Sequence, residues 1–494
     1  MYIPTIGLEI HAELKTKTKM FCACKNDGDE RRPNINVCPI CLGHPGTLPT
    51  INKRAVENVI KVGLALNGRI TDKSNFDRKS YFYPDLPKGY QISQYDHPLV
   101  EGGLLNGVRL TRIHLEEDAG RLNHDMDGST LVDFNRAGVP LMELVTEPDI
   151  KNSDEAMTFA QELQLILRYL GASDADMEKG QMRIEANISI APKDAKEYGT
   201  KVEVKNINSF KAVHDAIEYE LKRQEEIIAD GKKVTQETRG WNDVKKITES
   251  QRSKEEANDY RYFPEPDLPP LDLRTAFDLE KLKDEIPELP EAKRRRFGEE
   301  FGLDMKLVEI IITKKSWADY FEQSVSELKS KIAEGDIQLL ANYFITDLRN
   351  LINNSDINPV RSRARAKGAS PSGTAGAATS NGIKITPEHF AHLISLIQQD
   401  KISSRIAKNL LLKMFEAGED PETLIESGGM ELVSDESEIG KVIDDVLAVN
   451  EKSITDFKKG KLNALQFLLG QVMAKTKGKA DPNIAKRILE EKLK

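Results

Sequence analysis

All four cysteines of the chain lie between residues 22 and 41, as the pairs Cys22-Ala23-Cys24 and Cys38-Pro39-Ile40-Cys41. Four thiolates in two close pairs form the ligand set of a tetrahedral structural zinc site. Four cysteines in 494 residues are too few for a disulfide scaffold, and their clustering disfavours four unrelated buried thiols. We therefore predict a closed, structural zinc site with the ligands Cys22, Cys24, Cys38 and Cys41. The first pair has the less common C-x-C spacing. His44 is the reserve ligand, although a lone histidine in a Gly-Pro turn is more often a residue without such a role.

A second group of ionisable residues combines carboxylates with a histidine. Glu9 and His11 alternate with apolar residues, Glu116-Glu117-Asp118 supplies three acids in a row, and Glu143 lies within the apolar run 141–145. A carboxylate buried in that way is costly unless it is paired or binds a metal. Oxygen ligands with one imidazole suit Mg²⁺, which usually serves phosphates. The residues alone leave open the alternative, an exposed acidic sheet face with Glu143 paired to an arginine.

The common nucleotide-binding and hydrolase motifs are absent from the sequence. It contains no G-x-x-x-x-G-K-[ST] loop, no G-x-G-x-x-G after a strand, no H-E-x-x-H and no G-x-S-x-G. Any nucleotide site must therefore be of another kind. The Ser/Gly stretch at 368–374 has no flanking strand pattern, and we interpret it as a linker rather than an amidase signature.

The elements that must position the candidate residues begin with a strand. Ile6, Leu8 and Ile10 alternate with Glu9 and His11, so one face is apolar and the other ionisable. The stretches 181–190 and 201–206 repeat this alternation. Sheets with one polar face are usually antiparallel, with that face toward water or ligand.

Helical patterns separate these strands and dominate after residue 290. We predict one helix capped by Ser153 and ended by Gly171, and another that runs from Ser209 toward Gly231, with few other helices before Pro287. The first region is therefore α+β, an antiparallel-sheet domain, and all-α segments follow it. At about 150 residues per domain, the length predicts roughly three domains. We place them at 1–292, 293–403 and 404–494, with a flexible Arg/Ala/Gly/Ser-rich insert at 356–384.

Charge divides unevenly along the chain. The formal net charge is −9, yet residues 452–494 hold eleven Lys/Arg and four Asp/Glu residues. An acidic body with a basic C-terminal end fits a protein that meets a polyanion at one place, although a solvated Lys-rich helix explains the same pattern. The sequence shows no membrane-length apolar run and no secretory signal, which predicts a cytoplasmic protein.

Several long motifs resemble the B subunits of aspartyl/glutamyl-tRNA(Asn/Gln) amidotransferases. The resemblance covers residues 6 to about 490. The matching segments are I-G-L-E-I-H at 6–11, F-D-R-K-S-Y-F-Y-P-D-L-P-K-G-Y-Q-I-S-Q at 76–94, H-L-E-E-D-A-G at 114–120, D-F-N-R at 133–136, K-N-I-N-S-F at 205–210, Q-E-T-R-G-W at 236–241 and D-Y-R-Y-F-P-E-P-D at 259–267.

The resemblance implies an activity, cofactors and partners. Such subunits use ATP and Mg²⁺ to phosphorylate the side-chain carboxylate of misacylated Glu-tRNA(Gln) or Asp-tRNA(Asn), and ammonia then displaces phosphate to give the amide. An amidase-fold glutaminase subunit supplies the ammonia through a tunnel, and a small third subunit completes a heterotrimer. The architecture implied is a cradle domain with the kinase site, a helical domain and a tail domain that binds tRNA. Members with four such cysteines bind zinc.

The resemblance also assigns candidate site residues. Glu9, His11, Glu117 and Glu143 become the Mg²⁺ ligands, but Glu117 shares a strand side with Ile113 and Leu115, so a bulge or strand end must re-aim it. Three basic residues become further candidates: Lys79 and Lys88 for the phosphate or the ammonia path, and Arg183 for transition-state charge. Each of these is equally explained as a surface ion pair.

Two other functions compete with this interpretation. A noncatalytic, zinc-stabilised tRNA-binding scaffold explains the cysteines and the basic tail, but leaves the Glu9/His11/Glu117/Glu143 set without a purpose. A self-contained amidase is disfavoured because the Ser-rich signature and a Ser/Lys nucleophile arrangement are missing.

Overall fold

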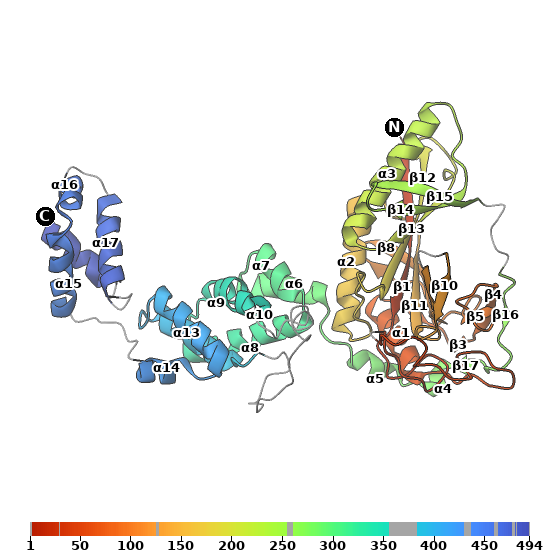
Figure 1. Cartoon of the computed structure of the whole chain (residues 1–494), viewed down its shortest axis with the longest axis horizontal. Coiled ribbons are helices and arrows are strands. Elements are labelled where there is room, and N and C mark those ends of the chain that lie inside the picture. The colour runs from red at the N-terminus through yellow and green to blue at the C-terminus, as the bar shows by residue number, and fades with distance from the viewer. Residues whose placement is uncertain are drawn as a thin grey trace. The chain divides into compact units, whose positions relative to one another are not determined.

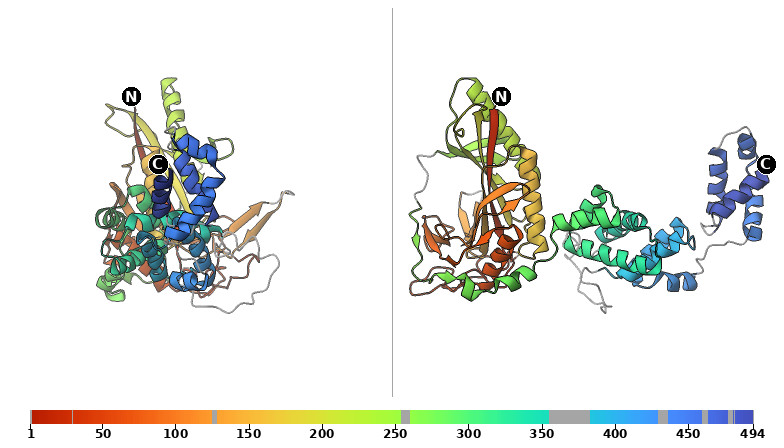
Figure 2. Two further views of the ribbon diagram at one scale, coloured as in Figure 1. Left: turned by 90° about the vertical axis from the view of Figure 1, so that its left-hand side faces the viewer. Right: turned by 180° about the vertical axis from the view of Figure 1, so that it is seen from behind.

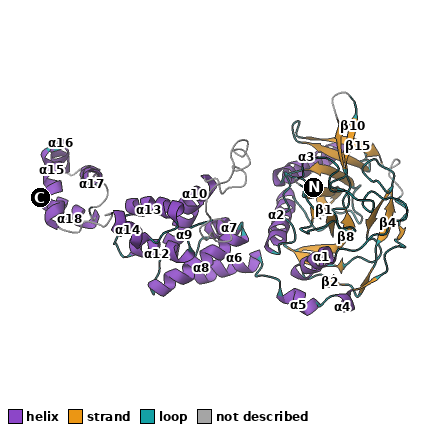
Figure 3. Ribbon diagram, turned by 60° about the horizontal axis from the view of Figure 1, so that its bottom comes forward, coloured by secondary structure: helices purple, strands orange, loops and turns teal. Residues whose placement is uncertain are grey.

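The computed structural model describes residues 2–28, 30–124, 128–253, 260–354, 383–428, 436–458, 463–476, 480 and 482–493. The chain divides into two compact units, Met1–Ala292 and Lys293–Lys494. Every described strand belongs to the first unit, and the second is helical (Figure 3). The expected α+β class, with a sheet domain followed by helical segments, is confirmed. The expected insert at 356–384 lies almost entirely outside the described residues.

A ten-stranded mixed sheet is the frame of the first unit. Its order is β15-β14-β13-β12-β1-β11-β8-β6-β2, with β7 paired to β8. Only the β13–β14 pair is parallel among the described pairings, so the antiparallel expectation holds for the rest. The strands are β1 (Tyr2–Glu13), β2 (Arg69–Ile70), β6 (Val100–Glu101), β7 (Leu104–Leu105), β8 (Val108–Glu117), β11 (Pro140–Thr146), β12 (Met182–Pro192), β13 (Val202–Ile207), β14 (Glu237–Asn242) and β15 (Ile247–Ser253).

Three small sheets accompany the large one. A three-stranded sheet joins β16 (Phe263–Pro264), β4 (Asp77–Ser80) and β5 (Tyr90–Ser93), which brings distant segments of the chain together. The strands β9 (Arg121–His124) and β10 (Thr130–Asp133) form a hairpin that projects from the unit in the left view of Figure 2. The third pair is β3 (Lys73–Ser74) with β17 (Leu271–Asp272).

The two faces of the large sheet differ in chemistry, as the alternation in β1 predicts. Ile6, Leu8 and Ile10 are at most 1% exposed, whereas Glu9 and His11 face the other side and are partly exposed. The helices α1 (Lys53–Ala65), α2 (Ser153–Tyr169) and α3 (Phe210–Ala229) contribute to the core on the apolar face. Figure 1 shows α2 and α3 on one side of the sheet and β4, β5 and β16 on the other. The polar face is therefore the side on which a site can be built.

Two helix predictions need correction. The N-cap of α2 is Asn152, whose side chain accepts from the backbone N–H of Glu155, and Ser153 is the first helical residue. The helix α1 was not predicted, although Asn52 caps it and its apolar stripe packs into the core. The Ser209 cap of α3 is confirmed by its bond from the Ala212 N–H.

The described part of the second unit is built from helices, and its buried apolar residues include the following two groups. Phe321, Phe344 and Phe390 lie among the buried residues of its first part, and a separate core gathers residues from Ile439 to Leu493. No helix within the described ranges is long and apolar enough to cross a membrane. The helices from the end of the first unit onward are α4 (Leu273–Ala276), α5 (Leu279–Asp284), α6 (Pro290–Phe301), α7 (Met305–Ile312), α8 (Lys315–Lys331), α9 (Ile337–Tyr343), the π-helical turn η2 (Phe344–Leu348), α10 (Arg349–Asn354), α12 (Pro387–Gln398), α13 (Ser404–Ala417), α14 (Pro421–Gly428), α15 (Glu436–Ala448), α16 (Glu451–Lys458), α17 (Asn463–Lys475) and α18 (Pro482–Leu493).

Candidate functional site

Three ionisable residues form a row across adjacent strands of the polar face. The register places His11 of β1 opposite Glu143 of β11, and Glu143 opposite His114 of β8. The Nε2 atoms of His11 and His114 each lie 3.3 Å from Oε2 of Glu143. Side chains directly opposite in neighbouring strands meet on the same face, so the sheet register itself assembles this row.

Two further carboxylates complete the cluster. Glu9 lies two residues before His11 in β1, and its Oε1 is 3.9 Å from His11 Nε2. Glu116 lies two residues after His114 in β8, and its Oε1 is 3.5 Å from His11 Nε2. We call Glu9, His11, His114, Glu116 and Glu143 the carboxylate–histidine cluster.

Burial and mutual charge shift the pKa values within the cluster. Burial, reinforced by the Glu143 carboxylate, raises the pKa of Glu9 to about 7. Burial lowers the pKa of His11, but the hydrogen bond and charge of Glu143, with the charges of Glu116 and Glu9, outweigh it and raise the pKa to about 9. Burial also disfavours an ionised Glu143, yet His114 and His11 hold its pKa well below the ordinary value.

The donor set of the cluster fits a divalent cation. Ligand atoms of Glu9, His11 and Glu143 lie within 4.8 Å of one another, and so do those of His114, Glu116 and Glu143. Carboxylate oxygens with an imidazole are compatible with Mg²⁺. Without a bound ion, His11 and His114 can balance the negative charge of Glu143 between them. The predicted ligands Glu9, His11 and Glu143 are thus brought together.

Glu117 is not brought to this cluster. It stays on the side of Ile113 and Leu115, as strict alternation requires, because the irregularity in the β8–β11 pairing lies at Val145/Thr146 and not near it. Its Oε1 lies 2.6 Å from Lys88 Nζ and accepts from the Ile92 N–H at 2.9 Å. No irregularity is described beside Glu117, and although β8 ends at this residue, the strand end does not turn its side chain toward the cluster. The neighbouring Glu116 lies there instead.

Lys88 and Glu117 line a cavity together with two of the cysteines. The cavity has a volume of about 110 Å³, and Cys22, Cys41 and Tyr90 also line it. The side chains of Lys88 and Glu117 are only 11% and 4% exposed. Because Glu117 and Glu116 point to opposite sides of β8, this buried ion pair is separate from the carboxylate–histidine cluster.

The other two basic candidates lie near the polar face. Burial disfavours a charged Lys79, but Glu116 and Glu143 are close enough to raise its pKa above the ordinary value. Arg183 is directly opposite His11 in the register of β1 and β12. Its guanidinium donates to Oδ1 of the buried Asp118 at 2.9 Å, which orients it at the edge of the cluster.

Sequence reasoning missed His114 and Glu116 as members of the cluster. Both lie on the same side of β8 as Arg112, whereas Ile113, Leu115 and Glu117 lie on the other side. Leu110, beyond the irregularity in this pairing, packs in the apolar core. Alternation within 112–117, compared with that in β1, could have identified them.

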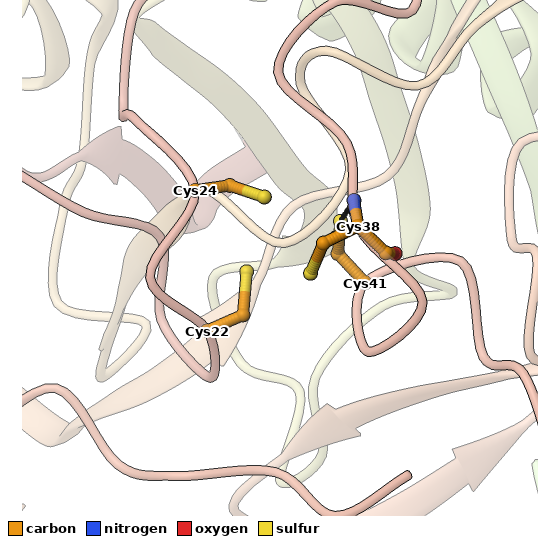
Figure 4. A group of neighbouring side chains, drawn as sticks. All are labelled: Cys22, Cys24, Cys38 and Cys41. Atoms are coloured by element: carbon orange, nitrogen blue, oxygen red, sulfur yellow. Dashed lines mark hydrogen bonds between the residues drawn. The ribbon is translucent and has the colours of Figure 1, made fainter.

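The four cysteines form a second cluster (Figure 4). The four Sγ atoms lie within 4.8 Å of one another, and none of them is in a disulfide. They belong to Cys22, Cys24, Cys38 and Cys41. The Lys19 N–H donates to the Cys24 carbonyl and the Cys38 N–H donates to the Cys41 sulfur at 3.1 Å, so both loops are fixed around the sulfurs. The side-chain hydrogen bond with Cys22 lowers the pKa of Cys41 to about 5. The Cys38 N–H and the charge of Lys19 also lower this pKa, whereas burial raises it. The set fits tetrahedral zinc, and His44 is not part of it.

A buried lysine accompanies the cysteines. Lys19 is 0% exposed, and its Nζ lies 3.9 Å from Cys41 Sγ and 3.2 Å from the Phe134 carbonyl oxygen. A buried ammonium requires a counter-charge, and four thiolates around a divalent ion leave a net negative charge. The surroundings of the cysteines are thus built for an anionic centre.

Comparisons with known proteins agree over the full chain. A family model described as the GatB/GatE catalytic domain matches residues 4–278, and one described as the GatB domain matches residues 319–493. The B subunit of the aspartyl/glutamyl-tRNA(Asn/Gln) amidotransferase from Caldicellulosiruptor bescii is 44% identical over 100% of this chain and 99% of its own. The B subunits of the same name from Rippkaea orientalis and Caldanaerobacter subterraneus are 43% and 44% identical, over 98% and 99% of their lengths.

Proposed function

The chain belongs to the GatB family, the B subunits of ligase-type tRNA-dependent amidotransferases, and from that premise we propose that its carboxylate–histidine cluster is the centre of an ATP-dependent carboxylate kinase. The substrate is the side-chain carboxylate of glutamate on tRNA(Gln), of aspartate on tRNA(Asn), or of both. The products are the corresponding amidated tRNAs, which serve protein biosynthesis in the cytoplasm.

The chemistry explains why such an activation is needed. A carboxylate is a poor electrophile, since its charge repels nucleophiles and oxide is a bad leaving group. Transfer of the γ-phosphoryl group of ATP to the carboxylate gives an acyl phosphate, and attack by ammonia then releases inorganic phosphate and forms the amide. The acyl phosphate must be shielded from water until ammonia arrives.

The residues of the cluster divide this work. Glu9, His11, Glu116 and Glu143 would hold Mg²⁺, which when bound supplies positive charge to phosphate oxygens. Lys79 places a cation beside Glu116 and Glu143, where the transferring phosphoryl group would lie. Arg183, oriented by Asp118, offsets charge at the opposite edge. Glu116 takes the ligand role that the resemblance assigned to Glu117.

Lys88 and Glu117 have a separate role in this proposal. Their buried pair lines the cavity beside the cysteines, so we assign it to the path of ammonia rather than to phosphate. Zinc in the cysteine cluster would hold the wall of that cavity and take no part in the chemistry.

The proposal includes partners and a division of the chain. An amidase-fold glutaminase and a small third subunit complete a heterotrimer, residues 1–292 form the cradle, 293–403 the helical domain and 404–494 the tRNA-binding tail. The basic stretch 452–494 supports this last assignment, since a tRNA backbone is recognised through its phosphates.

One observation carries the proposal. The register of β1, β11 and β8 gathers two histidines and three carboxylates on the face of the sheet that the core helices do not cover. Buried ionisable groups with perturbed pKa values that converge in this way mark functional sites.

The test is amidation of Glu-tRNA(Gln) by the chain co-expressed with its presumed partners, with ATP, Mg²⁺ and ammonium chloride instead of glutamine. We expect Glu9→Gln to abolish amide formation and to leave tRNA binding unchanged, and the exposed Glu197→Gln to change neither. Amidation that survives Glu9→Gln unchanged contradicts the kinase assignment. A wild type that binds tRNA but forms neither acyl phosphate nor amide supports the noncatalytic scaffold instead.

A further inference from the structure

Four tyrosine rings form a continuous row on the polar side of the first unit. The rings of Tyr95 and Tyr262 are stacked, with centroids 4.4 Å apart and an interplanar angle of 15°. Tyr260 contacts Tyr262 edge to face at 6.2 Å, and Tyr81 contacts Tyr260 in the same manner at 5.8 Å. We call Tyr81, Tyr260, Tyr262 and Tyr95 the tyrosine row.

The small sheet β16-β4-β5 holds the row in place. The Ser80 N–H donates to the Tyr260 carbonyl, and the Tyr95 N–H donates to Asp77 Oδ2 at 2.9 Å. Arg261, between two of the tyrosines, has a φ of 40°, a conformation that residues with a Cβ rarely adopt. Such a conformation persists only where the surroundings impose it, so the two rings are fixed by their contacts and not by the local chain.

The row borders the carboxylate–histidine cluster through two cations. Arg112 lies with its Cζ 5.8 Å from the centroid of the Tyr95 ring and a terminal nitrogen 4.0 Å from Oε1 of Glu143. Lys79 Nζ is 5.0 Å from the centroid of the Tyr260 ring. Ser93, two residues before Tyr95, donates to Glu116 at 3.1 Å. One end of the row is thus linked to Glu143 and Glu116 by single side chains.

The row is not part of the apolar core. None of its four residues is among the buried residues of that core, and Tyr95 is 48% exposed. An exposed aromatic ring that continues a stack, with a guanidinium nearby, offers a planar ligand both dispersion and a cation–π contact. Stacking of this kind is how aromatic side chains bind nucleobases.

We propose that the tyrosine row is a stacking platform for an adenine base, with Tyr95 as the ring that receives it. This inference rests on the proposed function, in which two adenines must come close to the cluster: that of ATP and that of the 3′-terminal adenosine of the acylated tRNA. Either adenine, stacked on Tyr95, has its phosphates or its ester within reach of the groups that surround Glu143.

The experiment uses the full chain purified with its partner subunits. Tyr95→Leu removes the ring and keeps apolar bulk, Tyr95→Trp keeps a stacking surface, and Tyr198→Leu is the matched control because Tyr198 is 74% exposed and lies outside the row. Equilibrium dialysis measures the dissociation constant of ATP with Mg²⁺. Filter binding measures those of uncharged tRNA(Gln) with and without its 3′-terminal adenosine. Thermal unfolding verifies that each variant is folded.

We expect Tyr95→Leu to weaken the binding of one of the two ligands about tenfold or more, and Tyr95→Trp to restore that affinity. Weaker ATP binding assigns the platform to ATP, and loss of the preference for the intact 3′ end assigns it to tRNA. If both affinities stay within twofold of those of Tyr198→Leu, the platform does not exist. These binding measurements do not depend on catalysis, so the platform survives a failure of the kinase assignment, which Glu9→Gln tests.

Discussion

His11 and His114 approach the same carboxylate oxygen, since each Nε2 lies 3.3 Å from Oε2 of Glu143. The three residues belong to three neighbouring strands and are paired in register. A single buried carboxylate between two imidazoles is stabilised in its ionised form without any ion. It can also exchange one imidazolium proton for a cation, which makes the cluster a site where protons and metal compete.

The neighbours Glu116 and Glu117 provide a matched pair for locating the metal. We expect Glu116→Gln to weaken Mn²⁺ binding, as a substitute for Mg²⁺, by about tenfold or more, because Glu116 joins the donor set. Glu117→Gln should leave Mn²⁺ affinity nearly unchanged, because Glu117 faces Lys88. Electron paramagnetic resonance titration of free Mn²⁺ measures both variants. Equal losses in the two variants contradict the geometry described for β8.

The cluster also makes stability depend on pH and Mg²⁺. The folded-state pKa of His11 is raised to about 9, so its contribution to stability is complete below its ordinary value of 6.5 and is lost as the pH rises through 9. The pKa of Glu9 is raised to about 7, so its burial costs stability as the pH rises from 4.5 through 7. Both effects make the metal-free chain less stable at higher pH, by up to about 1.4 kcal/mol per pH unit for each proton released.

Because Mg²⁺ replaces those protons, it should raise the melting temperature more at pH 8.5 than at pH 6.5. Differential scanning calorimetry with and without Mg²⁺ at the two pH values measures this difference. Glu9→Gln should reduce it, since one titrating group is removed. A larger Mg²⁺ effect at the lower pH is the opposite of what the cluster predicts.

The alternation of apolar and polar residues made the β1 part of the site predictable. The same alternation conflicted with the assignment of Glu117 in β8. The period of two in β1 places Glu9 and His11 on one face from the sequence alone, and the structure confirms that face. The same rule, applied to β8, opposed the assignment of Glu117 from family resemblance, and alternation holds from Arg112 to Glu117. Local periodicity is reliable for a regular stretch of strand, but an irregularity such as that between Leu110 and Arg112 switches the face of the residues on its far side.

Contacts between distant segments could not be read from the sequence. The row His11–Glu143–His114 depends on which strands are neighbours, and the stack of Tyr95 on Tyr262 depends on β16 returning to β4. The helix α1 was missed because its short apolar stripe follows a loop region rich in turn residues. The cysteine cluster was easier to predict, since the spacing of the four residues alone indicates a tetrahedral metal site.

Lys19 gives a prediction for the cysteine cluster. Replacing this fully buried lysine with methionine keeps its length and removes its charge, so the four sulfurs lose the ammonium 3.9 Å from Cys41. We expect Lys19→Met to weaken zinc binding about 10- to 100-fold, as the loss of a supporting contact does at other metal sites. Zinc retained after dialysis against a chelator, measured by atomic emission, reports the effect. Lys17→Met, at an exposed position, is the control and should retain zinc like the wild type.

The buried pair of Lys88 and Glu117 predicts a large coupling between two substitutions. Removing either partner leaves the other charge buried without a counter-ion, so Lys88→Met and Glu117→Gln should each lower the free energy of unfolding by about 3 kcal/mol or more. The double variant should lose clearly less free energy of unfolding than the two single variants lose together, because it leaves no unpaired charge. Urea unfolding of the four chains gives the coupling free energy, and strict additivity would mean that the pair is not formed in solution. Because Lys88 and Glu117 line the same cavity as Cys22 and Cys41, a loss of zinc in either single variant would show that the cavity wall and the metal site fold together.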